Sequence, residues 1–212
     1  EKGRELYRNI RGFVEAKQAI DETAQRVLPH GYMSAHPTFR SNERMTQAPV
    51  GGGNPNAMTL DDVYEAAKAA APGFTRSMRS IAMGAGLDPD EQVLFAPAKG
   101  RARSEEKIET EYGGEARRLV DVVRCSIVVD TEGQLISVAE ALARGGDGSV
   151  ALDGGAIRTA EGDVYEVVRL KNRFKEPLFN GYRDALYSVR VQIAPGVWHV
   201  CEMQLHLAAV IA

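Results

Sequence analysis

A run of positive charge stands out in the last third of the chain, where residues 164–174 alternate like a β-strand. Because alternate side chains of a strand share a face, five residues are predicted to lie together: Tyr165, Val167, Arg169, Lys171 and Arg173. Three cations on one face repel one another, so they favour an anion such as a phosphate group. A solvated edge strand, in which Lys and Arg discourage aggregation, explains the same pattern.

The strand expected at 197–206 separates into an apolar and a polar face. The apolar face holds Cys201, Met203, Leu205 and Leu207, and the polar face holds Trp198, Val200, Glu202, Gln204 and His206. Glu202 is the single carboxylate on the polar face, and a carboxylate that faces a cleft can bind a metal ion or take up a proton. A hydrated sheet face without chemistry is the alternative. The turn between the two strands contains Asn180-Gly181-Tyr182, whose aromatic ring could stack on a base.

Two further features lie earlier in the chain. Asp121 begins a β-rich segment at 122–130, and carboxylates on neighbouring strands commonly hold Mg²⁺ and a triphosphate. Taken alone, an aspartate at a turn explains this position as well. Four cations surround the start of a predicted helix: Lys99, Arg101, Arg103 and Lys107. Basic side chains and backbone amides at a helix N-terminus suit phosphate, although the glycine spacing of a Walker loop is absent.

The elements that would position these residues follow from periodicity and breakers. A helix with one apolar face is predicted over 3–28, and the polar, turn-rich residues 30–58 are interpreted as a flexible linker. We therefore predict an N-terminal arm at 1–58 and a domain at 59–212. The domain begins with a helix capped by Thr59 that Pro72-Gly73 ends, and a second helix then runs to about Ala85.

The remaining elements alternate between the two types. Strands are expected at 93–95, 122–130, 164–174, 183–193 and 197–206, and helices at 104–112 and 132–144. This order predicts an α+β fold in which helices pack on a mixed sheet.

Composition narrows the class of protein. The chain has 212 residues, 44% of them hydrophobic and 26% charged, as in ordinary soluble domains. The net charge of -3 makes an extended RNA-binding surface the less favoured expectation. No apolar run approaches the ~20 residues of a membrane helix, so we expect no membrane partner. Cys125 and Cys201 are predicted to be buried thiols, and the four histidines have no metal-ligand spacing with them.

Taken in order, these motifs resemble the RelA/SpoT-like synthetase domain of alarmone-producing pyrophosphokinases, over residues 59–212. The Lys-Asp-Tyr and Pro-x-x-Asn-Gly-Tyr motifs of that family are similar to Lys171-Asn172-Arg173 and Pro177-Leu178-Phe179-Asn180-Gly181-Tyr182. Its Glu-x-Gln-Ile-Arg motif is similar to the segment 202–206, its strand-initial Asp to Asp121, and its basic loop to residues 99–107.

The resemblance implies a nucleotidyltransferase-like fold and transfer of the β,γ-pyrophosphate of ATP to a ribose 3′-hydroxyl. By this resemblance Asp121 would hold Mg²⁺, and Glu202 would hold the metal or act as the base on the attacking hydroxyl. The ATP phosphates would be bound by Lys99, Arg101, Arg103, Lys107, Arg169 and Lys171. The purine acceptor would be bound by Asn180, Tyr182, Gln204 and His206.

The chain also departs from the family pattern near the acceptor. Asn172 stands at the family's Asp, and Arg183-Asp184-Ala185-Leu186 replaces Gln-Ser-Leu-His. These changes resemble a divergent toxin or effector branch, which implies a cytoplasmic site of action, an immunity or antitoxin partner, and delivery as part of a larger secreted protein. Two alternatives stay open: a pyrophosphokinase that modifies tRNA 3′ ends, and a non-catalytic nucleotide-binding domain.

Overall fold

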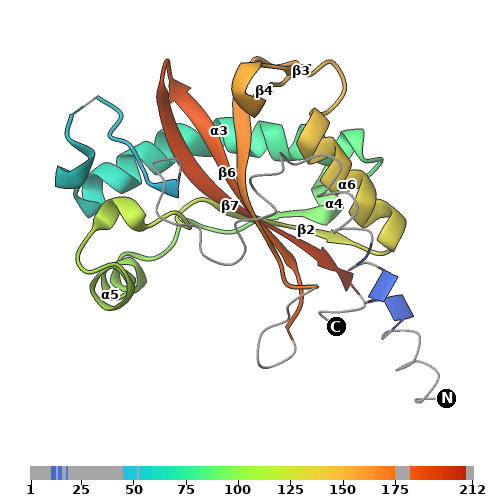
Figure 1. The fold of residues 1–212 in the computed structure, drawn as a ribbon, viewed down its shortest axis with the longest axis horizontal. Coiled ribbons are helices and arrows are strands. Elements are labelled where there is room, and N and C mark those ends of the chain that lie inside the picture. Colours follow the sequence, from blue (N-terminus) through green and yellow to red (C-terminus); the bar gives the residue numbers. More distant parts are fainter. Residues whose placement is uncertain are drawn as a thin grey trace.

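A seven-stranded sheet organises the part of the chain that the computed structural model describes, which is residues 11, 12, 14, 15, 18, 45–51, 53–174 and 182–208. The strands are β1 (Val93–Phe95), β2 (Arg124–Val129), β3 (Val150–Ala151), β4 (Ile157–Arg158), β5 (Val164–Asn172), β6 (Ala185–Ala194) and β7 (Val197–Leu207). Their order in the sheet is β1-β2-β7-β6-β5-β4-β3 (Figure 1). Among these described strands, β2 and β7 are the one pair that runs in parallel. The predicted α+β fold with a mixed sheet is therefore confirmed.

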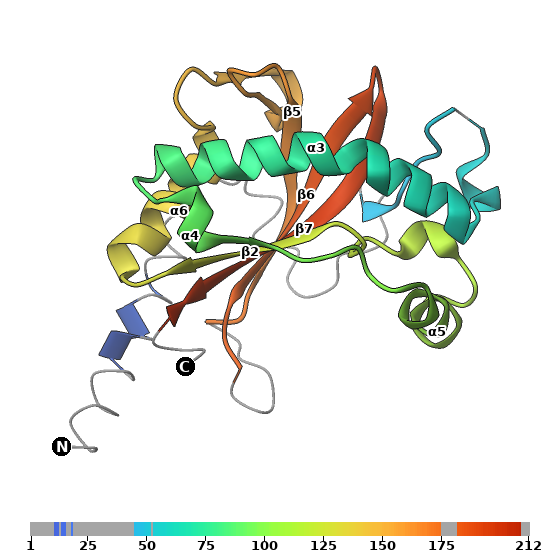
Figure 2. The ribbon, with the colours of Figure 1, turned by 180° about the vertical axis from the view of Figure 1, so that it is seen from behind.

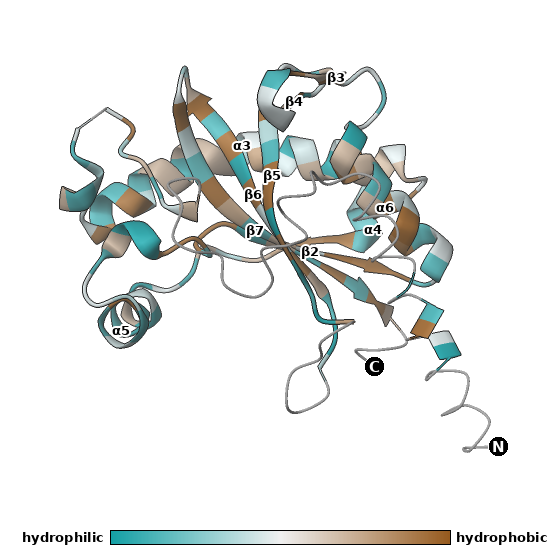
Figure 3. Cartoon of the chain, in the orientation of Figure 1, coloured by the Kyte–Doolittle hydropathy of each residue, from teal (hydrophilic) through white to brown (hydrophobic). Residues whose placement is uncertain are grey.

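Two helices cover one face of this sheet, α3 (Leu60–Gly84) and α6 (Glu132–Arg144) (Figure 2). Their apolar side chains form the main core with alternate residues of β2, β6 and β7. In Figure 3, β6 and β7 accordingly alternate between hydrophobic and hydrophilic segments. The remaining elements are short: α4 (Pro89–Gln92), α5 (Arg101–Glu111), η2 (Pro55–Ala57), η3 (Ala116–Arg118) and η4 (Asp153–Gly155). Helices α3 and α6 therefore do not cover the opposite face of the sheet.

Helix α3 continues through Pro72, so the predicted break at Pro72-Gly73 is wrong. A proline inside a helix removes one hydrogen bond and costs about 3 kcal/mol. The buried residues on both sides of Pro72, such as Ala70 and Phe74, belong to the same core, and their burial offsets that cost. Gly73 faces the sheet so closely that a Cβ there would lie 3.0 Å from Asp163 Oδ1 and 3.4 Å from Val191 Cγ1.

A β-bulge in β5 corrects the predicted face of that strand. The pairing with β6 shifts between Val167 and Arg169, so Val168 is an extra residue on β5. Tyr165 is therefore fully buried on the core face, where its hydroxyl donates to the Leu142 carbonyl at 3.0 Å. The prediction that Tyr165 and Val167 share a face with Arg169 and Lys171 is wrong, because the bulge reverses the alternation.

Gln47 attaches the segment 45–51 to the sheet. Its side-chain amide donates to the Val200 carbonyl at 2.9 Å and accepts from the Val200 N–H at 2.8 Å. It also donates to the Leu119 carbonyl at 3.0 Å. Gln47 thus supplies the hydrogen bonds of a missing strand next to β7. The predicted domain boundary at residue 58 stays a prediction, and of the predicted N-terminal helix the structure describes only residues 11, 12, 14, 15 and 18, all helical.

Candidate active site

Asp121 lies just before β2 and is held by two lysines. Its Oδ2 accepts from Lys99 Nζ at 2.7 Å and from Lys107 Nζ at 2.9 Å. Burial by itself would raise the pKa of the Asp121 carboxyl, but the two ammonium groups outweigh it and hold that pKa below its usual value. Burial likewise opposes the charge of Lys107, and the bond to Asp121 overcomes it and raises the lysine pKa. Asp121 is therefore ionised at neutral pH.

Glu202 lies on the central strand β7, next to the same end of β2. Its backbone N–H donates to the Val123 carbonyl at 3.0 Å, and its partner in the parallel register is Arg124. Burial raises the pKa of the Glu202 carboxyl, and the negative charge of Asp121 raises it further. Gln204 Nε2 donates to Glu202 Oε1 at 3.0 Å. The structure thus brings the two predicted carboxylates together and gives them opposite pKa shifts.

The bulge in β5 places the cations of that strand on the face of Glu202. Arg169 pairs with Ser188, which pairs in turn with Glu202 on the next strand. Lys171 follows one row further, through Leu186, opposite Gln204. Burial lowers the pKa of both Arg169 and Lys171, and repulsion from neighbouring cations adds to it. An anion bound over this face would offset both the cost of burying these charges and the repulsion between them.

The four residues of the predicted phosphate loop are divided by the structure. Lys99 and Lys107 contact Asp121, and together with Arg103 they line a cavity of about 250 Å³ beside α5. Arg103 is largely exposed, 3.9 Å from Glu106. Arg101 lies outside this group, because its guanidinium pairs with Asp61 at 2.6 Å and with Glu105 at 3.0 Å.

The predicted acceptor residues gather where β6 begins and β7 ends. The Tyr182 and His206 rings meet edge to face, with centroids 6.1 Å apart and planes at 71°. The Tyr182 hydroxyl donates to Asp184 Oδ2 at 3.3 Å, and burial and Asp184 raise the pKa of Tyr182 to about 12. Gln204 lies one alternate position before His206 on β7. Asn180 lies outside the described residues.

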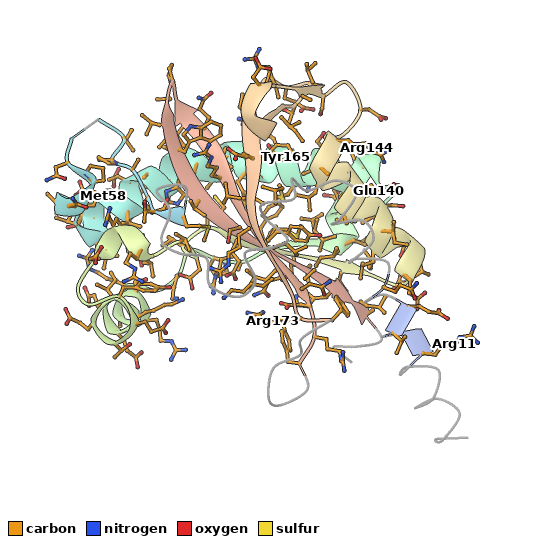
Figure 4. All side chains as sticks on the ribbon, in the orientation of Figure 1. Arg11, Met58, Glu140, Arg144, Tyr165 and Arg173 are labelled. Atoms are coloured by element: carbon orange, nitrogen blue, oxygen red, sulfur yellow. The ribbon has the colours of Figure 1, made fainter. Side chains whose placement is uncertain are left out.

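An ion pair that the sequence analysis did not assign holds this end of the site. Arg173 Nη1 donates to both carboxylate oxygens of the fully buried Asp184 at 3.0 Å. Arg183 Nη1 donates to the Phe174 carbonyl at 2.8 Å. In Figure 4, Arg173 lies at the far end of β5, well apart from Tyr165. The sequence offered one signal for this ion pair: Asp184 lies just before a strand, as Asp121 lies just before β2.

The carboxylates fit a divalent cation that is shared with phosphate. Among the described residues, no group of three or more His, Cys, Asp or Glu side chains is arranged to hold a metal ion. Mg²⁺ needs fewer protein ligands, since it commonly uses one or two carboxylates together with substrate phosphates and water. Asp121 Oδ1 is buried and has no hydrogen-bond partner, so one carboxylate oxygen is available for a cation. Asp121 and Glu202 are the residues that would hold it.

Comparison with known proteins finds similarity among solved structures. The type VI effector Tas1, solved in complex with its immunity protein, has 23% sequence identity and a TM-score of 0.49, over 78% of this chain and 66% of that chain. Small alarmone synthetase 1 from Bacillus subtilis, solved with its product pppGpp, has 18% identity and a TM-score of 0.42, over 56% of this chain and 55% of that one. A GTP pyrophosphokinase family protein from Streptococcus pneumoniae has 14% identity and a TM-score of 0.48, over 72% and 69%.

These structures include the alarmone synthetases and the effector class that the sequence motifs resemble. The chain spans just under two thirds of the Tas1 chain and about half of the synthetase chain. No family model and no curated protein matches the sequence. The described part of the chain has no helix that is long and apolar enough to cross a membrane. Function is therefore argued from the residues of the site.

Proposed function

We propose that this chain is a pyrophosphokinase that transfers the β,γ-pyrophosphate of ATP to the 3′-hydroxyl of a purine nucleotide. The observation that carries the proposal is the proximity of Asp121 and Glu202 where the parallel pairing of β2 and β7 begins, beside Lys99 and Lys107. Arg169 and Lys171 extend the positive charge along the same face. Phosphoryl transfer depends mainly on positioning and charge neutralisation, which such an arrangement supplies.

The opposite pKa shifts assign different roles to the two carboxylates. Asp121 stays ionised, which suits a cation ligand, and bound Mg²⁺ would supply charge neutralisation on the ATP phosphates. Glu202 has a raised pKa, which suits a general base. In the reaction the acceptor 3′-oxygen forms a bond to the β-phosphorus while the bond from that phosphorus to the α-phosphate oxygen breaks. The hydroxyl proton passes to the Glu202 carboxylate, and AMP leaves.

The remaining residues bind and orient the two nucleotides. Lys99, Arg103 and Lys107 line the cavity beside α5, together with Glu106, Thr110 and Glu111. We assign the three cations to the donor phosphates together with Arg169 and Lys171. The rings of Tyr182 and His206 contact each other edge to face. We assign these two aromatic side chains to the acceptor purine. Arg101 is assigned no role in the resting arrangement, since it is paired with Asp61 and Glu105.

One departure from the family motif has a structural explanation. Asn172 is buried on the core face, and its Oδ1 accepts from the Phe174 N–H at 3.1 Å. This bond fixes the turn that leaves β5, so Asn172 supports the backbone there. Asn172 therefore does not belong to the polar face, and its difference from the family's Asp takes no metal or proton ligand away from that face. The substitution is compatible with the proposal of an active enzyme.

The biological setting belongs to the same proposal. We infer that the chain acts as a toxin or effector domain in an ATP-containing cytoplasm, with an immunity protein as its partner. The divergent acceptor motif supports this, and Tas1, to which the chain is similar, is an effector with an immunity protein.

A labelling experiment tests the transfer. The protein is incubated with γ-labelled ATP and Mg²⁺, and with GDP, GTP, AMP, ADP, ATP or bulk tRNA in turn. Label on a purine nucleotide supports the proposal. Label on tRNA alone would assign the acceptor to RNA, and ATP binding without transfer would make the chain a non-catalytic nucleotide-binding domain; either result contradicts the proposal.

A further inference from the structure

A second cavity, of about 510 Å³, lies towards the opposite end of β7 from the Tyr182–His206 contact. Its lining includes Gln47, Asn56, Arg117, Arg190 and Trp198. Trp198 shares the polar face of β7 with Glu202 but precedes it by four residues, which is roughly 13 Å along a strand. The cavity has the size of a small-molecule site, since such sites measure about 300–1,000 Å³. None of the residues assigned above to pyrophosphate transfer lines it.

The charge of the lining favours an anion. Among the residues that the structure describes, two arginines line the cavity and no acidic residue does. The positive charge of Arg190 is already neutralised, because its Nε donates to the buried Glu166 carboxylate at 2.7 Å. Arg117 is bound less firmly: its partner Glu115, at 3.1 Å, is nearly half exposed. Exposed pairs of this kind contribute little to stability, so the Arg117 guanidinium can exchange Glu115 for a ligand anion.

The rest of the lining favours a flat aromatic ring. The Arg190 guanidinium lies over the Trp198 ring, 4.4 Å from its centroid. A stacked guanidinium–indole pair forms a planar platform of the type on which nucleic-acid bases stack. The exposed Asn56 belongs to the same lining, and its side-chain amide can both donate to and accept from the edge of a base.

We propose that this cavity binds a purine nucleoside monophosphate, or a ligand of the same chemistry, at a site separate from the transfer reaction. The ring lies against the Arg190–Trp198 platform, and the phosphate is bound by Arg117. Gln47 lines the cavity and also holds the backbone of Val200, so an occupied cavity adjoins the strand that carries Glu202.

Trp198 is the only tryptophan in the chain, so its fluorescence reports on this cavity. AMP is titrated into the full chain without Mg²⁺, and a saturable change in emission is expected. Adenosine and inorganic phosphate are titrated separately, and each should bind at least about tenfold more weakly than AMP, because each lacks half of the proposed contacts. No saturable change with AMP, or equal binding of adenosine, would overturn the inference.

Variants locate the bound AMP. Arg117→Ala should weaken binding about tenfold or more through the loss of a charged hydrogen bond. Arg118→Ala is the matched control, since Arg118 belongs to the same η3 turn but lies over the Tyr112 ring instead of lining the cavity. Lys171→Ala removes a phosphate ligand of the transfer site and should leave AMP binding unchanged. Loss in Lys171→Ala but not in Arg117→Ala would place AMP in the transfer site and contradict the inference.

The same protein samples are assayed for label transfer from ATP, with circular dichroism as the check on folding. Transfer without AMP-dependent fluorescence overturns only the cavity inference. Fluorescence that depends on Arg117 without any transfer supports the cavity inference and overturns only the proposed function.

Discussion

The Glu202 backbone N–H donates to the carbonyl of Val123 at 3.0 Å, and Val123 lies two residues after Asp121. This bond lies at the start of the parallel pairing of β2 and β7, and it holds two carboxyl groups near each other although they are far apart in the sequence. Their repulsion is part of the reason that the pKa of Glu202 is raised. A cation bound between the two carboxylates would remove that repulsion.

Glu202→Gln should reduce pyrophosphate transfer by about 100-fold to 10,000-fold, the usual contribution of a general base. The fold should remain, and the free energy of unfolding at pH 7 should not fall. The reason is that a raised carboxyl pKa makes ionisation costly in the folded state, a penalty present as pH rises above about 4.3. Urea unfolding and the label-transfer assay measure both effects. Glu91→Gln, on the exposed surface of α4, is the control; wild-type transfer by Glu202→Gln would refute its assignment.

Asp121→Asn should destabilise the protein at pH 7 by about 3 kcal/mol, because Lys99 and Lys107 lose a partly buried anionic partner. The pKa of Asp121 is lowered in the folded state, so its contribution is present above the unfolded value of about 3.9 and is lost as pH falls through the lower folded value. The difference in unfolding free energy between wild type and variant should therefore shrink in acid. A difference that stays constant from pH 7 to pH 3 would contradict this ion-pair explanation.

Gln47→Ala should destabilise the protein by about 2–3 kcal/mol, since it leaves the Val200 N–H and carbonyl without their partner. Chemical unfolding of the full chain measures the loss. Gln192→Ala serves as the comparison, because that residue is only half-buried on β6 and should cost less than about 0.5 kcal/mol. Equal effects of the two changes would mean that the segment 45–51 is not anchored by Gln47.

Alanine at two helical glycines should have opposite effects. Gly133→Ala in α6 meets only Thr131 Oγ1 at 3.8 Å, so the better helix propensity of alanine should stabilise by up to about 1 kcal/mol. Gly73→Ala in α3 would place a Cβ 3.0 Å from Asp163 Oδ1, and Asp163 is fixed by two hydrogen bonds from Arg76. We expect this variant to lose stability. Thermal unfolding compares the two, and a stabilised Gly73→Ala would show that the β4–β5 turn is free to yield.

The sequence was a reliable guide wherever a pattern is local. The alternation in β7 correctly separates buried Cys201 and Met203 from half-exposed Glu202 and Gln204, and Thr131 and Gly145 bound α6 as helix signals predict. The errors arose where tertiary contacts override local signals. Core packing carries α3 through Pro72, and the register shift at Val168 depends on a partner strand that no local pattern reveals.

The positions of the candidate site residues were likewise only partly predictable from the sequence. The structure places Asp121 in contact with Lys99 and Lys107, and Glu202 beside the start of β2, while the roles assigned to these residues stay predictions. Arg101 was predicted as a phosphate ligand but pairs with acids on α3 and α5, since charge alone does not fix the direction of a long side chain. Gln47 gave no signal, because a single glutamine in a polar segment has no periodicity.

Because Val168 is an extra residue, the side chains of β5 before and after it alternate in opposite phase. Tyr165 therefore faces the core, whereas Arg169 and Lys171 lie on the face of Glu202. Substitutions along this strand change one side chain at a time. A change of register in which Val168 took a regular place in the ladder would instead turn Arg169 and Lys171 towards the helices and expose Leu170 to water. The irregular pairing at Val168, more than the identity of any one cation on β5, therefore determines whether the surface beside Glu202 remains electropositive.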